Sequence, residues 1–228
     1  DLYKKVAASY NDQVKTLIQT EGEQKAQLNM LTALLKLRQI CSHPGVMDPS
    51  LVSPKLQYIL EQVEEVVDSG ESILIFTQFR YTLFALEKEL QKLAPTFVLH
   101  GGLSSKQRSD VLNEFNTNGK PSIMVMTLKV GGVGLNLTKA SYVYHMDPWW
   151  NPAVEAQATD RAHRLGQTKM VNIYKLAMRH SLEEKIFHLQ KQKKKIFDIL
   201  MNHEEFEKIE TDKSWLSKED FDFLLGAT

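Results

Sequence analysis

The chain has 228 residues, 43% hydrophobic and 25% charged, a composition typical of globular proteins and unlike that of disordered ones. Its 28 basic and 28 acidic residues exclude a uniformly basic surface, so any contact with nucleic acid must come from local clusters. A single cysteine, Cys41, excludes an internal disulfide and predicts a buried thiol rather than a metal site, although His43 is near. No apolar run approaches the ~20 residues that span a bilayer, so we expect a soluble intracellular protein without membrane contact.

The first 70 residues carry helical periodicity. Apolar residues recur three or four apart over residues 2–18 and again over 25–40, where a proline–glycine pair ends the pattern. A serine–proline pair at 53–54 begins a third amphipathic stretch, which stops before Gly70. The sequence therefore predicts an all-helical segment over residues 1–70.

After Gly70, short β-branched runs alternate with amphipathic stretches. The expected strands are residues 73–77, 96–100, 122–126, 141–146 and 171–177. The expected helices are residues 79–93, 104–116, 152–164 and 181–202. This alternation predicts an α/β fold, in which helices cover a parallel sheet. The tail over residues 203–228 is acidic and aromatic, with a weak helical pattern at 217–225.

Residues that follow the expected strands are candidates for function, because ligands of such sheets bind outside the carboxyl ends of the strands. After the third strand come Gly131, Gly132 and Gly134, which allow close approach of the backbone and leave amides free to face phosphate oxygens. A glycine-rich loop alone is weak evidence, since a tight strand-to-helix turn has the same composition.

The fourth strand is followed by a helix start, with Asn151 as N-cap and Pro152 as first helical residue. Along this helix Gln157, Arg161 and Arg164 share one face. Arginines on one helical face are usually solvated or paired with carboxylates. Here the face begins at the carboxyl edge of the sheet, next to the glycine loop, which favours a ligand-binding role.

These motifs resemble those of a known family. The stretch DPWWNPAVEAQATDRAHRLGQ at 147–167 closely resembles the last helicase motif of the Swi/Snf family of superfamily-two helicase-like ATPases. Residues 127–138 resemble the preceding motif, and ILIFTQF at 73–79 and LHGG at 99–102 resemble two earlier ones. LRQICSHP at 37–44 resembles the linker helix that introduces the second lobe. The resemblance runs in order over residues 1–202.

The resemblance implies a RecA-like second lobe at 71–180. A helical linker and protrusion at 1–70 precede it, and a brace helix at 181–202 and the tail at 203–228 follow. It also implies that ATP binds between this lobe and a first RecA-like lobe, with Mg²⁺ held by the first lobe. The implied partners are double-stranded DNA, the first lobe and a DNA-bound protein substrate. The implied compartment is the nucleus of a eukaryote or the cytoplasm and nucleoid of a prokaryote.

Several residues acquire roles from the same resemblance. Arg164 matches the arginine finger, Arg161 also reaches the ATP phosphates, and Gln157 couples this helix to the nucleotide. The nucleotide-facing loop positions are Gly132, Gly134 and Asn136. The positions that match or adjoin DNA-backbone contacts are Gln78, Arg80, Gly101, Gly102, Thr127, Lys129 and Trp150. Packing under the helix start is an equal alternative for Trp150, and is favoured for Trp149.

A complete motor also needs a phosphate-binding loop and an acidic metal-holding motif, and this sequence contains neither. We therefore expect the chain alone to be inactive as an ATPase. A strand-separating helicase of the same superfamily is one alternative, and a non-catalytic docking module is another. A stand-alone nucleotide-binding enzyme is disfavoured by the missing phosphate loop.

Overall fold

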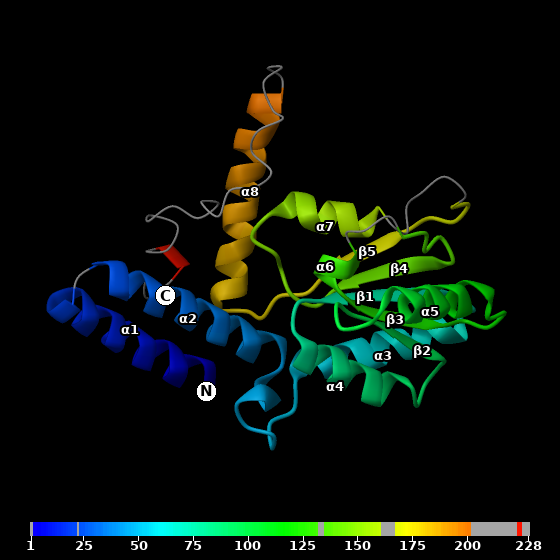
Figure 1. The fold of residues 1–228 in the computed structure, drawn as a ribbon, viewed down its shortest axis with the longest axis horizontal. Coiled ribbons are helices and arrows are strands. Elements are labelled where there is room, and N and C mark those ends of the chain that lie inside the picture. Colours follow the sequence, from blue (N-terminus) through cyan, green and yellow to red (C-terminus); the bar gives the residue numbers. More distant parts are fainter. Residues whose placement is uncertain (1, 22, 132–134, 161–166, 202–222, 225–228) are drawn as a thin grey trace. The chain divides into compact units, whose positions relative to one another are not determined.

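The computed structural model describes residues 2–21, 23–131, 135–160, 167–201 and 223–224 (Figure 1). The chain divides into two compact units. Unit 1 comprises residues 1–41, 148–152 and 177–228, and unit 2 comprises residues 42–147 and 153–176. The sequence-based division at residues 70, 180 and 202 stays a prediction.

Unit 2 contains a five-stranded sheet in the order β2-β3-β1-β4-β5, and every neighbouring pair is parallel. The strands are β1 (Ser72–Thr77), β2 (Thr96–Leu99), β3 (Ile123–Thr127), β4 (Ala140–His145) and β5 (Asn172–Lys175). The central strand β1 is buried along its whole length, because helices cover both faces of the sheet. The predicted α/β fold is thus confirmed.

Five α-helices and one 3-10 turn make up the described helical part of unit 2. They are α3 (Pro54–Asp68), α4 (Arg80–Leu90), α5 (Ser105–Thr117), α6 (Leu128–Gly131), α7 (Pro152–Thr159, whose first residue belongs to unit 1) and a 3-10 turn at Pro44–Val46. Ser53 caps α3 by accepting a hydrogen bond from Leu56 N, and Ser104 and Gln107 form a capping box at α5. The 3-10 turn and α6 were not predicted, because elements of three or four residues are too short for a periodic pattern.

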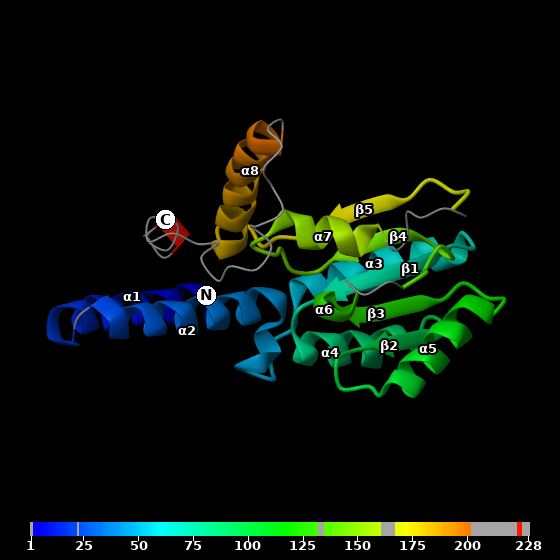
Figure 2. The ribbon, with the colours of Figure 1, turned by 45° about the horizontal axis from the view of Figure 1, so that its top comes forward.

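The main core lies between the sheet and the helices α3 and α4. Ile59 and Val63 of α3, Leu86 of α4 and Ile75 of β1 are all fully buried in it, and Tyr144 of β4 joins the same cluster. His145, the next residue of β4, points to the opposite face, where it bonds to Thr159 of α7. Helices therefore cover the two faces of the sheet (Figure 1), and Figure 2 shows α5 beside the edge strand β2.

Unit 1 contains the helices α1 (Leu2–Glu21), α2 (Glu23–Ser42, whose last residue belongs to unit 2) and α8 (Leu182–Met201). Leu34 and Leu37 of α2 pack with Leu182 and Ile186 of α8. The Tyr3 hydroxyl accepts a hydrogen bond from Leu182 N at 2.7 Å, and burial raises the pKa of Tyr3 to about 12. No helix within the described ranges is both long and apolar enough to cross a membrane.

Three predicted helices extend beyond what the structure describes. The helix predicted at 181–202 is described as α8, as far as Met201. The helix predicted at 152–164 is described as far as Thr159, and residues 161–166 lie outside the described ranges. Of the weak helix predicted at 217–225, only residues 223–224 are described, and they are helical.

Candidate functional site

The carboxyl ends of the parallel strands gather the predicted functional turns at one edge of the sheet. Because β2, β3 and β1 are neighbours, the turns that follow them emerge side by side. These turns and their flanking residues carry every predicted DNA-contacting residue except Trp150: Gln78, Arg80, Gly101, Gly102, Thr127 and Lys129. Sequence positions up to 50 residues apart are thus brought together, as the register of Thr77 with Thr127 shows.

The turn between β1 and α4 is held by Asp147, which lies two residues beyond the end of β4. Oδ2 of Asp147 accepts hydrogen bonds from Thr77 Oγ1 at 2.6 Å and from Gln78 N at 3.0 Å. Phe79 N in turn donates to Thr77 Oγ1 at 3.3 Å. Arg80 follows as the exposed first residue of α4. The predicted DNA contacts Gln78 and Arg80 therefore extend from a turn that is fixed by a buried carboxylate.

The turn after β2 approaches Arg80. Gly102 N donates to His100 Nδ1 at 3.0 Å, and the His100 ring packs edge-on against Phe84 of α4. The Arg80 guanidinium lies 5.7 Å from the centre of the Phe84 ring. A Cβ added to Gly102 would lie 3.0 Å from ring atoms of His100 and 3.8 Å from Arg80 Nη2, so no side chain fits there without displacement of the histidine.

The turn after β3 contributes a cation and the start of the glycine loop. Thr127 ends β3 and is half-buried, while Lys129 in α6 is exposed. The described chain resumes at residue 135, and the exposed Asn136 is tied to α5, because Asn116 Nδ2 donates to its carbonyl oxygen at 3.1 Å. The predicted nucleotide-facing residues Gly132 and Gly134 lie outside the described residues.

Helix α7 has an exposed side that carries Gln157 and a buried side that anchors it to the sheet. Glu155 is fully buried and forms an ion pair with Lys175 of β5. Thr159 Oγ1 donates to Glu155 O at 3.0 Å. These contacts seat the helix that leads to Arg161 and Arg164, which themselves lie outside the described residues.

His145 lies beneath α7 and is 1% exposed. Its Nε2 lies 2.9 Å from Thr159 Oγ1, whose single proton is given to Glu155 O, so His145 Nε2 is the donor and Nδ1 carries no proton. The ring stacks on Phe76 at 5.1 Å between centroids. The pKa of His145 is lowered to about 3, mainly by burial and also by the positive charge of Lys175, while Asp147 opposes the shift. The imidazole is therefore neutral at physiological pH.

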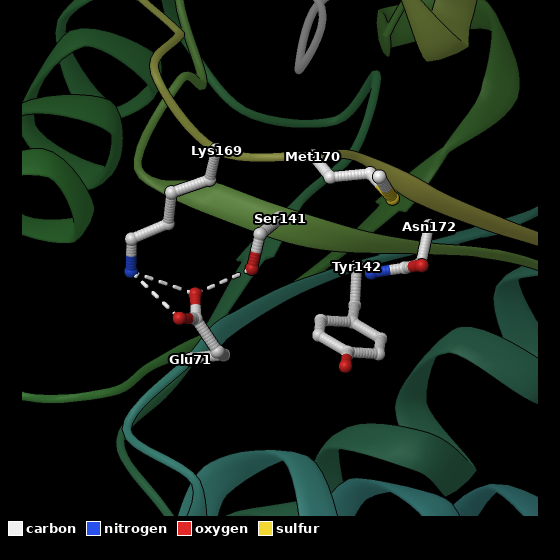
Figure 3. Close-up of a pocket in the computed structure, with 6 residues that line it drawn as sticks. All are labelled: Glu71, Ser141, Tyr142, Lys169, Met170 and Asn172. Carbon is white, nitrogen blue, oxygen red and sulfur yellow. Dashed lines mark hydrogen bonds and ion pairs between the residues drawn. The ribbon is translucent and has the colours of Figure 1, made fainter.

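The segment that follows residue 166 is fastened to the opposite, amino edge of the sheet. Gln167 Nε2 donates to the carbonyl oxygens of Thr138 and Ala140 at 3.0 and 2.9 Å. Lys169 Nζ lies 2.8 Å from both carboxylate oxygens of Glu71, as Figure 3 shows. The Lys169 hydrogen bond, aided by one from Ser141, lowers the pKa of Glu71.

A shallow pocket occupies the same amino edge. It is lined by Glu71, Ser141, Tyr142, Lys169, Met170 and Asn172 (Figure 3). Its charged groups are already engaged in the Glu71–Lys169 ion pair, and the predicted functional turns emerge at the other end of the strands. The pocket is therefore separate from the candidate site.

In unit 1, the Pro148–Trp150 segment is enclosed by side chains of α2 and α8. Arg38 is 5% exposed, donates from Nη2 to Pro148 O at 3.0 Å, and lies 5.3 and 4.6 Å from the ring centres of Trp149 and Trp150. Gln190 Nε2 donates to Trp149 O at 2.5 Å. Trp150 also packs against the apolar cluster of unit 1. This geometry matches the packing alternative for both tryptophans, and a DNA contact by Trp150 stays a prediction.

Within the part of the chain that the structure describes, no group of three or more histidine, cysteine, aspartate or glutamate side chains could hold a metal ion.

Comparisons with known proteins identify the family. The model of the helicase conserved C-terminal domain matches residues 54–166. The solved structure of a Sulfolobus solfataricus SWI2/SNF2 ATPase C-terminal domain is 30% identical, covers 99% of this chain and 93% of its own, and superposes with a TM-score of 0.75. The chain belongs to the SWI2/SNF2 ATPase family and corresponds to its C-terminal domain.

Two further proteins are similar over most of this chain. The Sulfolobus solfataricus SWI2/SNF2 ATPase core in complex with dsDNA is 33% identical, with a TM-score of 0.75, over 98% of this chain and 48% of its own. An uncharacterized ATP-dependent helicase of Mycoplasma pneumoniae is 37% identical over 179 residues, which are 76% of this chain and 17% of that protein. This SWI2/SNF2 domain thus spans about a sixth of that relative.

The predicted family and RecA-like fold of the SWI2/SNF2 domain are confirmed, whereas the roles of its site residues stay predictions. The structure brings Arg80 close to Gly102 and places Lys129 on the same edge. The structure adds His100 and Asp147, which lie within the motifs given above but had no role predicted from the sequence. Their positions immediately after strands were the available signal, but their hydrogen-bond partners are set only by the fold.

Proposed function

We propose that this SWI2/SNF2 domain is the second motor lobe of an ATP-dependent double-stranded DNA translocase or remodeller. Its proposed partners are the N-terminal RecA-like lobe, duplex DNA and a protein bound to that DNA. The observation that carries the proposal is the convergence of Gln78, Arg80, Gly102 and Lys129 at one edge of the sheet. The similarity to a SWI2/SNF2 core solved with dsDNA supports it.

The DNA-facing residues suit a grip on phosphates rather than a reading of bases. A translocase must hold every sequence equally, so backbone amides, hydroxyls and isolated cations serve better than side chains that pair with base edges. The exposed turn at Gly101 and Gly102 allows a phosphate to approach the backbone closely, because neither residue has a side chain. Arg80 and Lys129 supply positive charge, and Thr127 supplies a hydroxyl.

The ATP-facing residues complete a site whose other half lies on the first lobe. In this proposal Arg164 and Arg161 neutralise negative charge that develops on the phosphates, and Gln157 couples their helix to the nucleotide. Gly132, Gly134 and Asn136 approach the phosphates and ribose. Mg²⁺ is held by the first lobe and supplies further neutralisation of phosphate charge.

The described part of α7 supports this role by its contacts with the sheet. Glu155 and Thr159 fix the buried side of the helix to β4 and β5, and Gln167 fixes the chain beyond the arginines. Catalytic side chains act best when buried neighbours hold the elements that carry them. The anchoring on either side of residues 161–166 is what such a finger requires. We further propose that the 228-residue chain alone hydrolyses no ATP, because it contains no phosphate-binding loop.

The Arg164→Ala variant of the full-length protein tests the proposal. We expect DNA-stimulated ATP hydrolysis to fall by roughly 10³-fold or more, while duplex DNA binding changes little. Arg179→Ala is the matched control, since Arg179 is exposed before α8 and has no role in the proposed site. Parallel loss of DNA binding and hydrolysis would show that Arg164 is structural. Efficient strand displacement by the wild type would favour the strand-separating alternative.

A further inference from the structure

Asp147 carries a carboxylate that the proposed motor residues do not use. The side chain is 4% exposed, and a buried carboxylate is costly unless it is hydrogen-bonded. Its Oδ2 atom accepts from Thr77 Oγ1 and Gln78 N, at 2.6 and 3.0 Å. Its Oδ1 atom is buried and has no hydrogen-bond partner among the described residues. Within the described part of the chain only one oxygen of this buried carboxylate is hydrogen-bonded, an arrangement that proteins keep mainly where function requires it.

The Asp147 carboxylate organises the whole turn between β1 and α4. Thr77 gives its hydroxyl proton to Asp147 and accepts Phe79 N at 3.3 Å, so one carboxylate and one hydroxyl hold the amides of both Gln78 and Phe79. Phe79 is the N-cap of α4 and makes no side-chain cap hydrogen bond. The start of α4 therefore depends on a residue 68 positions later in the chain.

The position of this turn decides where two proposed DNA contacts point. Gln78 lies within the turn, and Arg80 is the first residue of α4. A shift of the turn would move the Arg80 guanidinium away from Phe84 and Gly102, beside which it now lies. Asp147 lies two residues beyond the end of β4, and the chain continues from it into the segment that leads to α7.

We propose that Asp147 is a positioning residue that holds the Thr77–Arg80 turn ready for DNA phosphates and thereby couples DNA binding to ATP hydrolysis. The inference rests on the proposed function. It assigns no contact with DNA or ATP to Asp147, which acts through Thr77 and the turn amides. The coupling arises because Asp147 fixes the DNA-facing turn, and the chain runs on from Asp147 into α7, the ATP-facing helix.

The test measures ATP hydrolysis by the full-length protein against the concentration of duplex DNA. Thr77→Val removes the hydroxyl and with it two bonds of the network. We expect the DNA concentration for half-maximal stimulation to rise roughly tenfold, as for loss of a hydrogen bond to a charged group. The rate without DNA should stay within about twofold, because no group that touches ATP changes. Thr77→Ser should restore the wild-type response.

Two further variants make the test specific. Asp147→Asn should raise the half-maximal DNA concentration like Thr77→Val, and the double variant should add little, since both disrupt one network. Thr82→Val is the matched control, because Thr77 and Thr82 are each 1% exposed. Thr82 lies on α4 and shares a 2.7 Å hydrogen bond with Ser42 Oγ. It should lower the melting temperature without changing the DNA dependence.

The outcomes separate this inference from the proposed function. If wild-type hydrolysis does not respond to DNA, the proposed function fails and the inference fails with it. If the wild type responds, but Thr77→Val changes the DNA dependence no more than Thr82→Val does, only the inference is wrong. The same holds if Thr77→Ser behaves like Thr77→Val, because the hydroxyl is then irrelevant.

Discussion

Acid should destabilise unit 2 through the buried imidazole of His145. Burial holds its pKa near 3, below the ordinary value of 6.5, so the folded protein keeps the ring neutral at pH values where the unfolded chain protonates it. The stability that depends on this neutral ring is fully present above pH 6.5 and is lost as the pH falls toward about 3. Unfolding should therefore become easier throughout that window.

The magnitude follows from the two pKa values. At pH 5.0, about 1.5 units below the ordinary pKa of 6.5, protonation of this ring stabilises the unfolded state by about 2 kcal/mol. The folded state lacks this stabilisation because its ring is still neutral. At pH 7.5 the contribution is close to zero. At pH 5.0 most carboxylates are still ionised, so their titration adds little. His43, whose pKa burial also lowers, remains in wild type and variant and cancels in the comparison.

The assay compares the wild type with His145→Gln at the two pH values. Hydrogen exchange of the β1 and β4 amides gives the opening free energy of unit 2 alone, which avoids a two-state assumption for the whole chain. The variant loses the stacking on Phe76 and should be less stable at pH 7.5. The gap between the two proteins should narrow by about 2 kcal/mol at pH 5.0. An equal gap at both pH values would refute a buried neutral histidine.

Two further predictions concern buried charges. Lys175→Met removes one ion-pair partner of the fully buried Glu155 carboxylate and should destabilise unit 2 by up to about 3–5 kcal/mol, whereas adding Glu155→Gln should recover most of this in the same exchange assay. Arg38→Met removes a cation beside Trp149 and Trp150 and the hydrogen bond to Pro148 O. The fluorescence emission of these two tryptophans is measured in a protein that also carries Trp215→Phe. Arg38→Met should shift this emission at a urea concentration at which the protein with Trp215→Phe alone is still folded. Unchanged emission would contradict the enclosure of the Pro148–Trp150 segment.

Much of the fold could be predicted from local patterns. The run from Ser72 to Thr77 is buried at every position, as its continuous apolar, β-branched character predicts for a central parallel strand. Ser104 and Gln107 form the capping box that marks the start of α5. The four-residue helix α6 was missed because it is too short to show a periodic pattern.

The candidate site was predictable only in part. The family resemblance singled out Arg80, Gly102 and Lys129 from the sequence, and their roles stay predictions. The hydrogen bond from Thr77 to Asp147 spans 70 positions, and no spacing rule predicts which carboxylate reaches which turn. The same limit explains why His145 was not singled out as a buried neutral group.

The sequence by itself determined the α/β fold of this protein, its family and the order of its functional turns, because these depend on periodicity and on motifs of consecutive residues. The tertiary structure alone decided that Asp147 fixes the turn before Arg80 and that the Pro148–Trp150 segment is enclosed by Arg38. The reason is physical: hydrogen bonds and packing act over a few ångströms in space, and the fold brings together residues that the chain keeps far apart.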